Sequence, residues 1–387
     1  MAFGSQGKQA LEGIRLRNPT WIPYPSPMTF DLAICGAGPA GAACAIAAAR
    51  DGWRVALIER AVFPRHKVCG DCLNPSLWPV LDSLGVAGAI RALDHAALHR
   101  VRFVSGNGRP LEISLPPGIE RAVTRELFDG VMLQAALDAG VTHFSGEPLT
   151  GVVRLNDKWR LTTSTVSLTA KTLVAADGRN STTCRLLGIS PPGTPGNKGR
   201  VALQCHAPIH PDYQGTVALE LLPHGYCGIA PVDDRRMNIC LVSDAPDFTA
   251  AKAQIQTRFQ LPSDQIWHSL APLDRADLPP APLPGCFLTG DAARVVEPFT
   301  GEGIYYALRS GQLAAAAIGQ HLSGDPPGAA ASYGASHRDL YRNRLWVNRL
   351  SRLAVTNRRL GNCLLAVGHQ FPGVMRLLTA KVANASA

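Results

Sequence analysis

The hydrophobic pattern is most regular near the start of the chain, where two apolar runs flank a stretch of small residues. Residues 30–35 (FDLAIC) and 54–59 (RVALIE) have the composition of strands that are buried on both faces. Between them, residues 40–50 (AGAACAIAAAR) predict a helix that ends at Asp51-Gly52. A strand, a helix and a strand within about 30 residues make a βαβ unit. Such a unit requires a parallel sheet.

Further along, the periodicity changes from helical to strand-like and back. Apolar residues recur at helical spacing from Arg125 to Gly140, and Leu173 to Ala176 is a short buried strand. Alternation between about 200 and 275, as in VALELL and MNICLV, predicts an antiparallel sheet. A buried strand returns at Cys286 to Thr289, before a helix from Gly303 to about Leu322. We predict an α/β fold with a Rossmann-like domain that is discontinuous in sequence, an antiparallel-sheet substrate domain and a helical C-terminal tail.

These changes of pattern also give the expected domain boundaries. Residues 1–28 contain four closely spaced prolines and read as a poorly ordered leader. The remaining expected units are the cofactor domain at 29–200 and 276–330 with part of the substrate domain inserted around 75–120, the substrate domain at 201–275, and the helical C-terminal region at 331–387.

Charge and cysteine content narrow the function classes. The formal net charge of +9 suits an anionic ligand, a nucleic acid or a membrane surface, but the sequence contains no nucleic-acid module, so we expect no nucleic-acid partner. Ten scattered cysteines and the lack of a secretory signal favour a reducing cytoplasm. No window is apolar enough for a spanning helix, which leaves a soluble or membrane-peripheral protein.

A glycine motif lies at the turn between the first strand and the first helix. In Gly36-Ala37-Gly38-Pro39-Ala40-Gly41 the first glycine permits a tight turn, the second lets the backbone approach a pyrophosphate and the third allows close helix–strand packing. Glu59, which ends the second strand, is placed to accept hydrogen bonds from a ribose, and we include its neighbour Arg60 in the site. The motif therefore predicts dinucleotide binding.

A second block, residues 285–308 (GCFLTGDAARVVEPFTGEGIYYAL), narrows the choice of dinucleotide. It resembles the geranylgeranyl reductase branch of the FAD-dependent monooxygenase and reductase superfamily, the p-hydroxybenzoate hydroxylase-like proteins. The resemblance implies FAD, with Asp291 of Gly290-Asp291 on the ribityl chain. It also implies that the loop with Pro298, Gly301, Gly303 and Ile304 lies beside the isoalloxazine ring. A helix N-terminus there offers N–H groups to a reduced, anionic flavin.

Three more segments match that superfamily in order, so the resemblance spans roughly residues 30–325. Residues 65–71 (RHKVCGD) resemble the Cys-Gly-Asp signature, which places Cys69 and Gly70 near the ring. Arg125 matches an arginine on the diphosphate side of FAD. Asp177, in the segment DGRNS, matches an Asp-Gly motif with roles toward FAD and pyridine nucleotide.

Cys69 and Cys72 have the spacing Cys-x-x-Cys, which fits a redox dithiol, half a zinc site or two unrelated thiols. No second pair of cysteines or histidines completes four zinc ligands, so we predict no metal. We name Cys69 as a candidate catalytic residue that lines the flavin pocket.

The residues leave the reaction open. The resemblance implies hydride transfer to an alkene of a hydrophobic isoprenoid or polyketide substrate. The segment GYCGIAP at 225–231 keeps Tyr226 and Pro231 but lacks the tryptophan and phenylalanine of the reductase branch. An aromatic or polyketide hydroxylase acting through a flavin C4a-hydroperoxide is therefore the alternative, and a flavin-binding protein without turnover is a third. The electrons would come from NAD(P)H or from a donor protein. The choice stays open because the chain has no second glycine motif for a nicotinamide cofactor.

The tail is rich in arginine. Helical spacing would place Arg338, Arg342, Arg349, Arg352 and Arg359 on one face. A solvated face and contact with anionic lipid head groups or a diphosphate substrate are the two interpretations.

Overall fold

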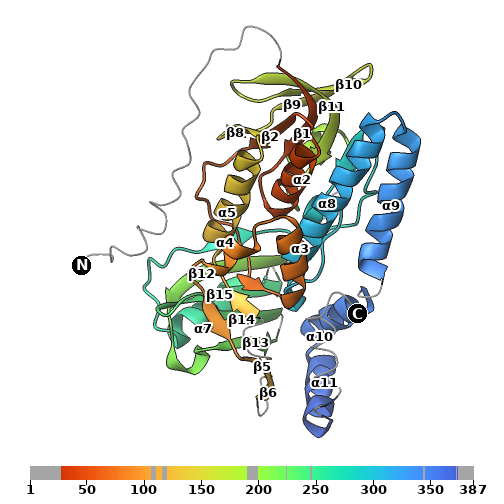
Figure 1. The fold of residues 1–387 in the computed structure, drawn as a ribbon. Coiled ribbons are helices and arrows are strands. Elements are labelled where there is room, and N and C mark those ends of the chain that lie inside the picture. The colour runs from red at the N-terminus through yellow and green to blue at the C-terminus, as the bar shows by residue number, and fades with distance from the viewer. Residues whose placement is uncertain are drawn as a thin grey trace, which may run out of the picture.

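The computed structural model describes residues 28–105, 110–115, 120–189, 199–223, 225–244, 246–342, 345–371 and 373. The predicted leader, residues 1–28, lies outside this range except for Met28. Two large sheets organise the described residues, one in the upper and one in the lower half of Figure 1, with the C-terminal helices along one side. The predicted α/β fold is confirmed.

The first sheet has seven strands around a parallel centre. β1 lies between β2 and β11, with parallel pairing on both sides, and β2 also pairs in parallel with β8. Because this centre is covered on both faces, β1 and β2 read as continuous apolar runs. The strands are β1 (Met28–Cys35), β2 (Val55–Glu59), β8 (Thr142–Ser145), β9 (Gly151–Leu155), β10 (Lys158–Thr162), β11 (Ser167–Ala175) and β17 (Cys286–Leu288).

Helices cover this sheet, and two of them pack closely on each other. α2 (Pro39–Arg50) lies against α8 (Gly303–Leu322) because its small side chains leave little between the two backbones. The predicted start and end of α8 are confirmed. The other helices of this region are α3 (Trp78–Ser83), α4 (Ala87–Arg91), α5 (Arg125–Asp138), α6 (Thr182–Leu186) and α9 (Pro326–Arg342).

The second sheet also has seven strands, and all its neighbours are antiparallel except β13 and β5. Its outer face packs on α7 (Phe248–Arg258) through a cluster that includes Ile239, Leu241 and Ile255. Its inner face is turned toward the first sheet. The strands in spatial order are β16 (His268–Leu270), β12 (Arg200–Pro208), β15 (Arg236–Asp244), β14 (Gly225–Pro231), β13 (Thr216–Leu222), β5 (Arg100–Val104) and β6 (Leu111–Ser114).

A small third sheet joins the two halves. It contains β3 (Cys72–Leu73), β7 (Glu120–Ala122) and β4 (Ala96–Leu98), and all its pairings are antiparallel. Its middle strand, β7, begins at Glu120 and pairs with both of the others.

The C-terminal region forms separate helices rather than one. After α9, the chain forms α10 (Leu345–Thr356) and α11 (Arg358–Gln370), which lie beside β13, β14 and β6 of the second sheet. The prediction that the five arginines share one helical face is therefore wrong, since Arg338 and Arg342 belong to α9 and the others to α10 and α11. Within the described ranges, no helix combines the length and apolar character that crossing a bilayer requires.

Candidate active site

A cavity of about 760 Å³ lies between the two large sheets and extends to α10 and α11. Every residue predicted to bind the cofactor lines it except Gly41, which packs against the backbone of Gly36. The lining residues among them are Gly36, Gly38, Pro39, Ala40, Glu59, Arg60, Cys69, Gly70, Arg125, Asp177, Gly290, Asp291, Pro298, Gly301, Gly303 and Ile304.

The turn between β1 and α2 depends on two glycines. Gly36 has φ of +104°, which side chains rarely allow, and a Cβ on Gly41 would collide with the carbonyl oxygen of Gly36. Glu59 holds the turn against β2, because its carboxylate accepts hydrogen bonds from the N–H groups of Ala37 (2.9 Å) and Ala61 (3.0 Å). The open backbone and the N-terminus of α2 together make an anion-binding turn at the cavity wall.

Basic side chains surround the cavity next to this turn. Asp129, which is fully buried, accepts two hydrogen bonds of 2.8 Å from Arg125 and lies 3.1 Å from Arg65. The carboxylate thereby fixes both guanidinium groups at the cavity wall. Lys67 adds a third positive group, and burial lowers its pKa, helped by the charge of Arg125. The arrangement suits a ligand with several negative charges.

The Cys-Gly-Asp loop is held by the second sheet. The N–H of Cys69 donates to Gln204 Oε1 (3.2 Å), and its carbonyl accepts from Asn238 Nδ2 (2.7 Å). Asp71 is buried with φ of +58°, accepts from Gln204 Nε2 (3.2 Å) and lies 2.8 Å from His206 Nε2. Burial raises the pKa of the Asp71 carboxyl. Side chains of β12 and β15 therefore position Cys69 at the cavity.

Cys69 and Cys72 are both free thiols, and the Cys72 Sγ donates to the carbonyl of Gly70 (3.4 Å). Burial raises the pKa of both thiols, so both are protonated near neutral pH. A protonated thiol is a poor nucleophile. The structure therefore presents Cys69 as a lining group and not as an activated thiolate.

The predicted Asp177 organises its own loop. Its carboxylate accepts hydrogen bonds from Ser181 Oγ (2.5 Å) and from the N–H (2.8 Å) and Oγ1 (2.9 Å) of Thr183, at the start of α6. Arg179 extends from this loop to Asp291, with 3.5 Å between Nη2 and Oδ2. The carboxylate of Asp291 is partly exposed toward the cavity, where the Gly-Asp segment was expected.

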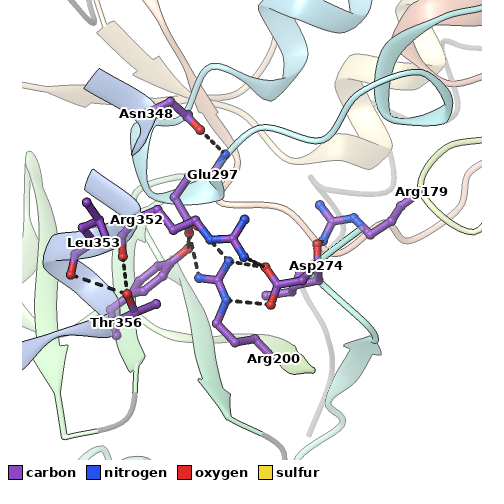
Figure 2. Close-up of polar contacts among 10 residues, drawn as sticks. Arg179, Arg200, Asp274, Glu297, Asn348, Arg352, Leu353 and Thr356 are labelled. Carbon is purple, nitrogen blue, oxygen red and sulfur yellow. Dashed lines mark hydrogen bonds and ion pairs between the residues drawn. The ribbon is translucent and has the colours of Figure 1, made fainter. Parts of the chain in front are cut away.

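A buried ion-pair network supports the loop that carries Pro298. Arg200 of β12 donates to the carboxylates of Asp274 (2.9 and 3.2 Å) and Glu297 (2.8 and 3.2 Å), as Figure 2 shows. The hydroxyl of Tyr226 also donates to Glu297 (3.2 Å). Glu297 is 3% exposed, so its negative charge depends on these partners. The network ties the second sheet to the loop that precedes α8.

The same network attaches α10. Arg352 donates to Asp274 (2.6 Å), and the N–H of Glu297 donates to Asn348 Oδ1 (2.9 Å). Both side chains come from α10, on the left in Figure 2. These contacts hold α10 over one end of the cavity.

That end of the cavity is apolar. The inner face of the second sheet contributes side chains at alternate positions of β5 and β13, namely Val101, Phe103, Val217, Leu219 and Leu221. Opposite them are Phe299 and side chains of the C-terminal helices, namely Val347, Leu350, Ala354, Leu364 and Leu365. We call this end the apolar arm and the glycine-turn end the dinucleotide end.

Glu120 lines the same cavity and lies near Cys72. Burial raises the pKa of its carboxyl to about 7. A carboxyl with such a pKa holds a proton over much of the neutral range.

Several residues of the cavity escaped the sequence reasoning. Arg65 and Lys67 belong to the matched segment 65–71, and their positive charge beside Cys69 and Gly70 was the available signal. Glu120 and the lining residues of β5, α10 and α11 carry no motif.

The glycine turn and the basic cluster form a site of dinucleotide-binding type, and the cavity continues from it into the apolar arm. The family described as FAD binding domain matches residues 29–338, so the chain belongs to that family. The chain is 32% identical over 320 residues to the menaquinone reductase of Mycolicibacterium smegmatis, covering 74% of this chain and 75% of that protein. It is an FAD-dependent oxidoreductase.

Solved structures share the fold. A geranylgeranyl bacteriochlorophyll reductase-like protein from Thermoplasma acidophilum superposes with a TM-score of 0.76 at 20% identity, covering 91% of this chain and 99% of that one. PqsL, a probable FAD-dependent monooxygenase from Pseudomonas aeruginosa, gives 0.73 at 19% identity, covering 87% of this chain and all of that one. Reductases and monooxygenases are thus both among the similar proteins.

The residues at the dinucleotide end fit FAD. Gly38 lines the cavity without a side chain, so a pyrophosphate could approach its backbone, and Arg125 and Lys67 would supply compensating charge. Glu59 and Asp291 line the cavity and would present carboxylate oxygens to hydroxyl groups of the ribose and ribityl chain of bound FAD.

Proposed function

We propose that the protein reduces a carbon–carbon double bond in a hydrophobic substrate of isoprenoid or polyketide type. The observation that carries this proposal is the apolar arm, because its walls are aliphatic and aromatic on both sides. Such a wall favours a long apolar ligand over a small polar one through the area that it removes from water. The relatives named as reductases of menaquinone and of geranylgeranyl groups add support.

Bound FAD would supply a hydride when reduced, and the protein would position the alkene and exclude water. Leu219 and Leu221 of β13 would contact one side of the chain of the substrate, with Val347 and Leu364 on the other. The Arg352 contact to Asp274 would keep α10 closed over the arm. Gln204 and Asn238 would keep the Cys69 loop at the cavity wall.

Reduction of an alkene also requires a proton. Glu120 is a suitable donor, since burial raises the pKa of its carboxyl to about 7 and it lines the cavity. The Oε proton would pass to the alkene carbon that does not receive the hydride, and solvent would reprotonate the carboxylate. Activity should therefore fall as pH rises through about 7, and Glu120→Gln should remove that limb of the profile.

The test is a single-turnover reaction of the reduced holoenzyme under anaerobic conditions with geranylgeranyl diphosphate or menaquinone. A product with two added hydrogens, formed without oxygen, would support the proposal. A product with one added oxygen atom, formed only after admission of air, would replace it with hydroxylation, which PqsL-like relatives favour. Reoxidation that no substrate accelerates would indicate flavin binding without turnover.

The reductant is tested in the same experiment. NADPH, NADH and a ferredoxin-type donor would each be offered to the oxidised holoenzyme before substrate. We propose direct reduction by NAD(P)H, because Arg60 and Arg185 line the open cavity wall and suit a second phosphorylated nucleotide. Reduction by the protein donor alone would contradict this part.

A further inference from the structure

Half of the exposed large apolar side chains in the described part of the chain lie at its C-terminal end. Trp346 and Leu353 on α10 are 50% and 56% exposed, and Val367 and Phe371 at α11 are 41% and 55% exposed. The other four are distributed over residues 62–266. Trp346 and Leu353 are seven residues apart and therefore share one helical face. Apolar side chains gathered in this way mark an interaction surface.

The same segment holds almost all of the excess charge. From Leu340 to Ala387 the sequence has eight arginines and lysines and no acidic residue, which leaves a net charge of only +1 for the rest of the chain. Arg349, on the exposed face of α10, and Arg359, on that of α11, are both exposed. A surface that combines tryptophan, leucine and phenylalanine with arginine complements an anionic, partly apolar partner.

The opposite faces of these two helices line the apolar arm. Val347, Leu350 and Ala354 of α10 contact the cavity, while Trp346 and Leu353 of the same helix face outward. α10 and α11 are therefore the wall between the substrate site and the basic, apolar surface. A hydrophobic substrate that enters past this wall would come from whatever the surface binds.

We propose that the outer faces of α10 and α11 bind the surface of an anionic phospholipid bilayer and that the substrate enters the apolar arm from it. The origin of the substrate rests on the proposed function, whereas the binding does not. Apolar side chains insert at the level of the head groups, and arginines pair with lipid phosphates. The lipid source is favoured over an acidic protein because Trp346 and Phe371 expose large apolar areas that a charge-only contact would not need.

Binding is measured by co-sedimentation of the holoenzyme with vesicles of phosphatidylcholine alone or with about one-third phosphatidylglycerol. We expect binding to the anionic vesicles only, weakened by added salt. Arg349→Gln with Arg359→Gln should weaken it roughly 30-fold, since each arginine near an anionic surface contributes roughly a factor of five. Leu353→Ser with Phe371→Ser should weaken it at least about tenfold. Val153→Ser with Arg160→Gln, exposed on β9 and β10, is the matched control and should bind normally.

Three outcomes would overturn the proposal. The first is that the wild type does not bind anionic vesicles, and the second is that the control and the C-terminal variants lose vesicle binding equally. The third is that the C-terminal variants lose binding to an acidic acyl carrier protein but still bind the vesicles. The last would make an acidic protein the partner. Because sedimentation needs no substrate, binding without alkene reduction would refute the proposed function and leave the docking surface intact.

Discussion

The two ends of the cavity are built in different ways. At the dinucleotide end, polar groups have designated partners, as when Asp129 bridges Arg65 and Arg125 and Glu59 holds two backbone N–H groups. In the apolar arm the walls are side chains such as Leu219, with few directional contacts. Directional contacts constrain residue identity, whereas an apolar wall requires only suitable size and shape. The first end can therefore be recognised in sequence and the second cannot.

The largest effect at the dinucleotide end is expected at Gly41, where a side chain has no space. Gly41→Val should abolish FAD binding, because its side chain collides with the carbonyl oxygen of Gly36 and displaces the turn. The flavin-to-protein ratio of the purified variant, from its absorption spectrum, is the measurement. Gly88→Ala is the control, since a Cβ there meets nothing within 4 Å, and it should retain full flavin content. Stoichiometric flavin in Gly41→Val would contradict the assignment of the turn.

Arg200 ties the second sheet to the loop that precedes α8. Replacing it tests how much this ion pair stabilises the fold. Arg200→Met should lower the free energy of unfolding by about 3–5 kcal/mol, because it leaves the buried Glu297 without its ion pair. Arg352→Ala should cost at most about 1 kcal/mol, because that arginine is half exposed. Denaturant titration of the two holoenzymes compares them. Equal losses would mean that the Glu297 carboxylate does not depend on Arg200.

Glu120 lines the cavity and makes its contribution to stability dependent on pH. Its pKa rises from 4.5 to about 7 on folding, so the stability it contributes is full below pH 4.5 and is lost as pH rises through about 7. Relative to Glu120→Gln, the wild type should lose about 3 kcal/mol of unfolding free energy between pH 4.5 and 8. Chemical denaturation across this range is the measurement. A constant difference between the two proteins would mean that folding does not shift the pKa of Glu120.

The smallest expected effect concerns the apolar arm alone. Leu219→Asn should lower kcat/KM for a hydrophobic substrate roughly 30-fold, which corresponds to a loss of about 2 kcal/mol of transition-state stabilisation, while flavin content stays normal. Steady-state kinetics with a matched short-chain substrate would show whether the loss depends on the length of the apolar chain. An equal loss for both substrates would place Leu219 outside the substrate path.

The sequence supported the fold and the dinucleotide end better than the rest. The strand at residues 30–35 and the helix from Gly303 were predictable because burial on both faces and a glycine start leave local signals. The apolar arm was not, because Leu219 and Leu364 come together only through the packing of distant elements. The one-face interpretation of the C-terminal arginines failed because a single helix was assumed where the chain forms three.

The pairing of β17 with β11 also sets the order of events during synthesis. A hydrogen bond joins Thr289 to Ala175, which are 114 residues apart, and five of the seven strands of the second sheet, β12 to β16, lie between them in sequence. A nascent chain must therefore leave the ribosome through nearly all of that sheet before the cofactor domain gains its last parallel strand and its second glycine loop. FAD capture is then a late event in the life of each molecule, and truncated products released earlier would carry no flavin.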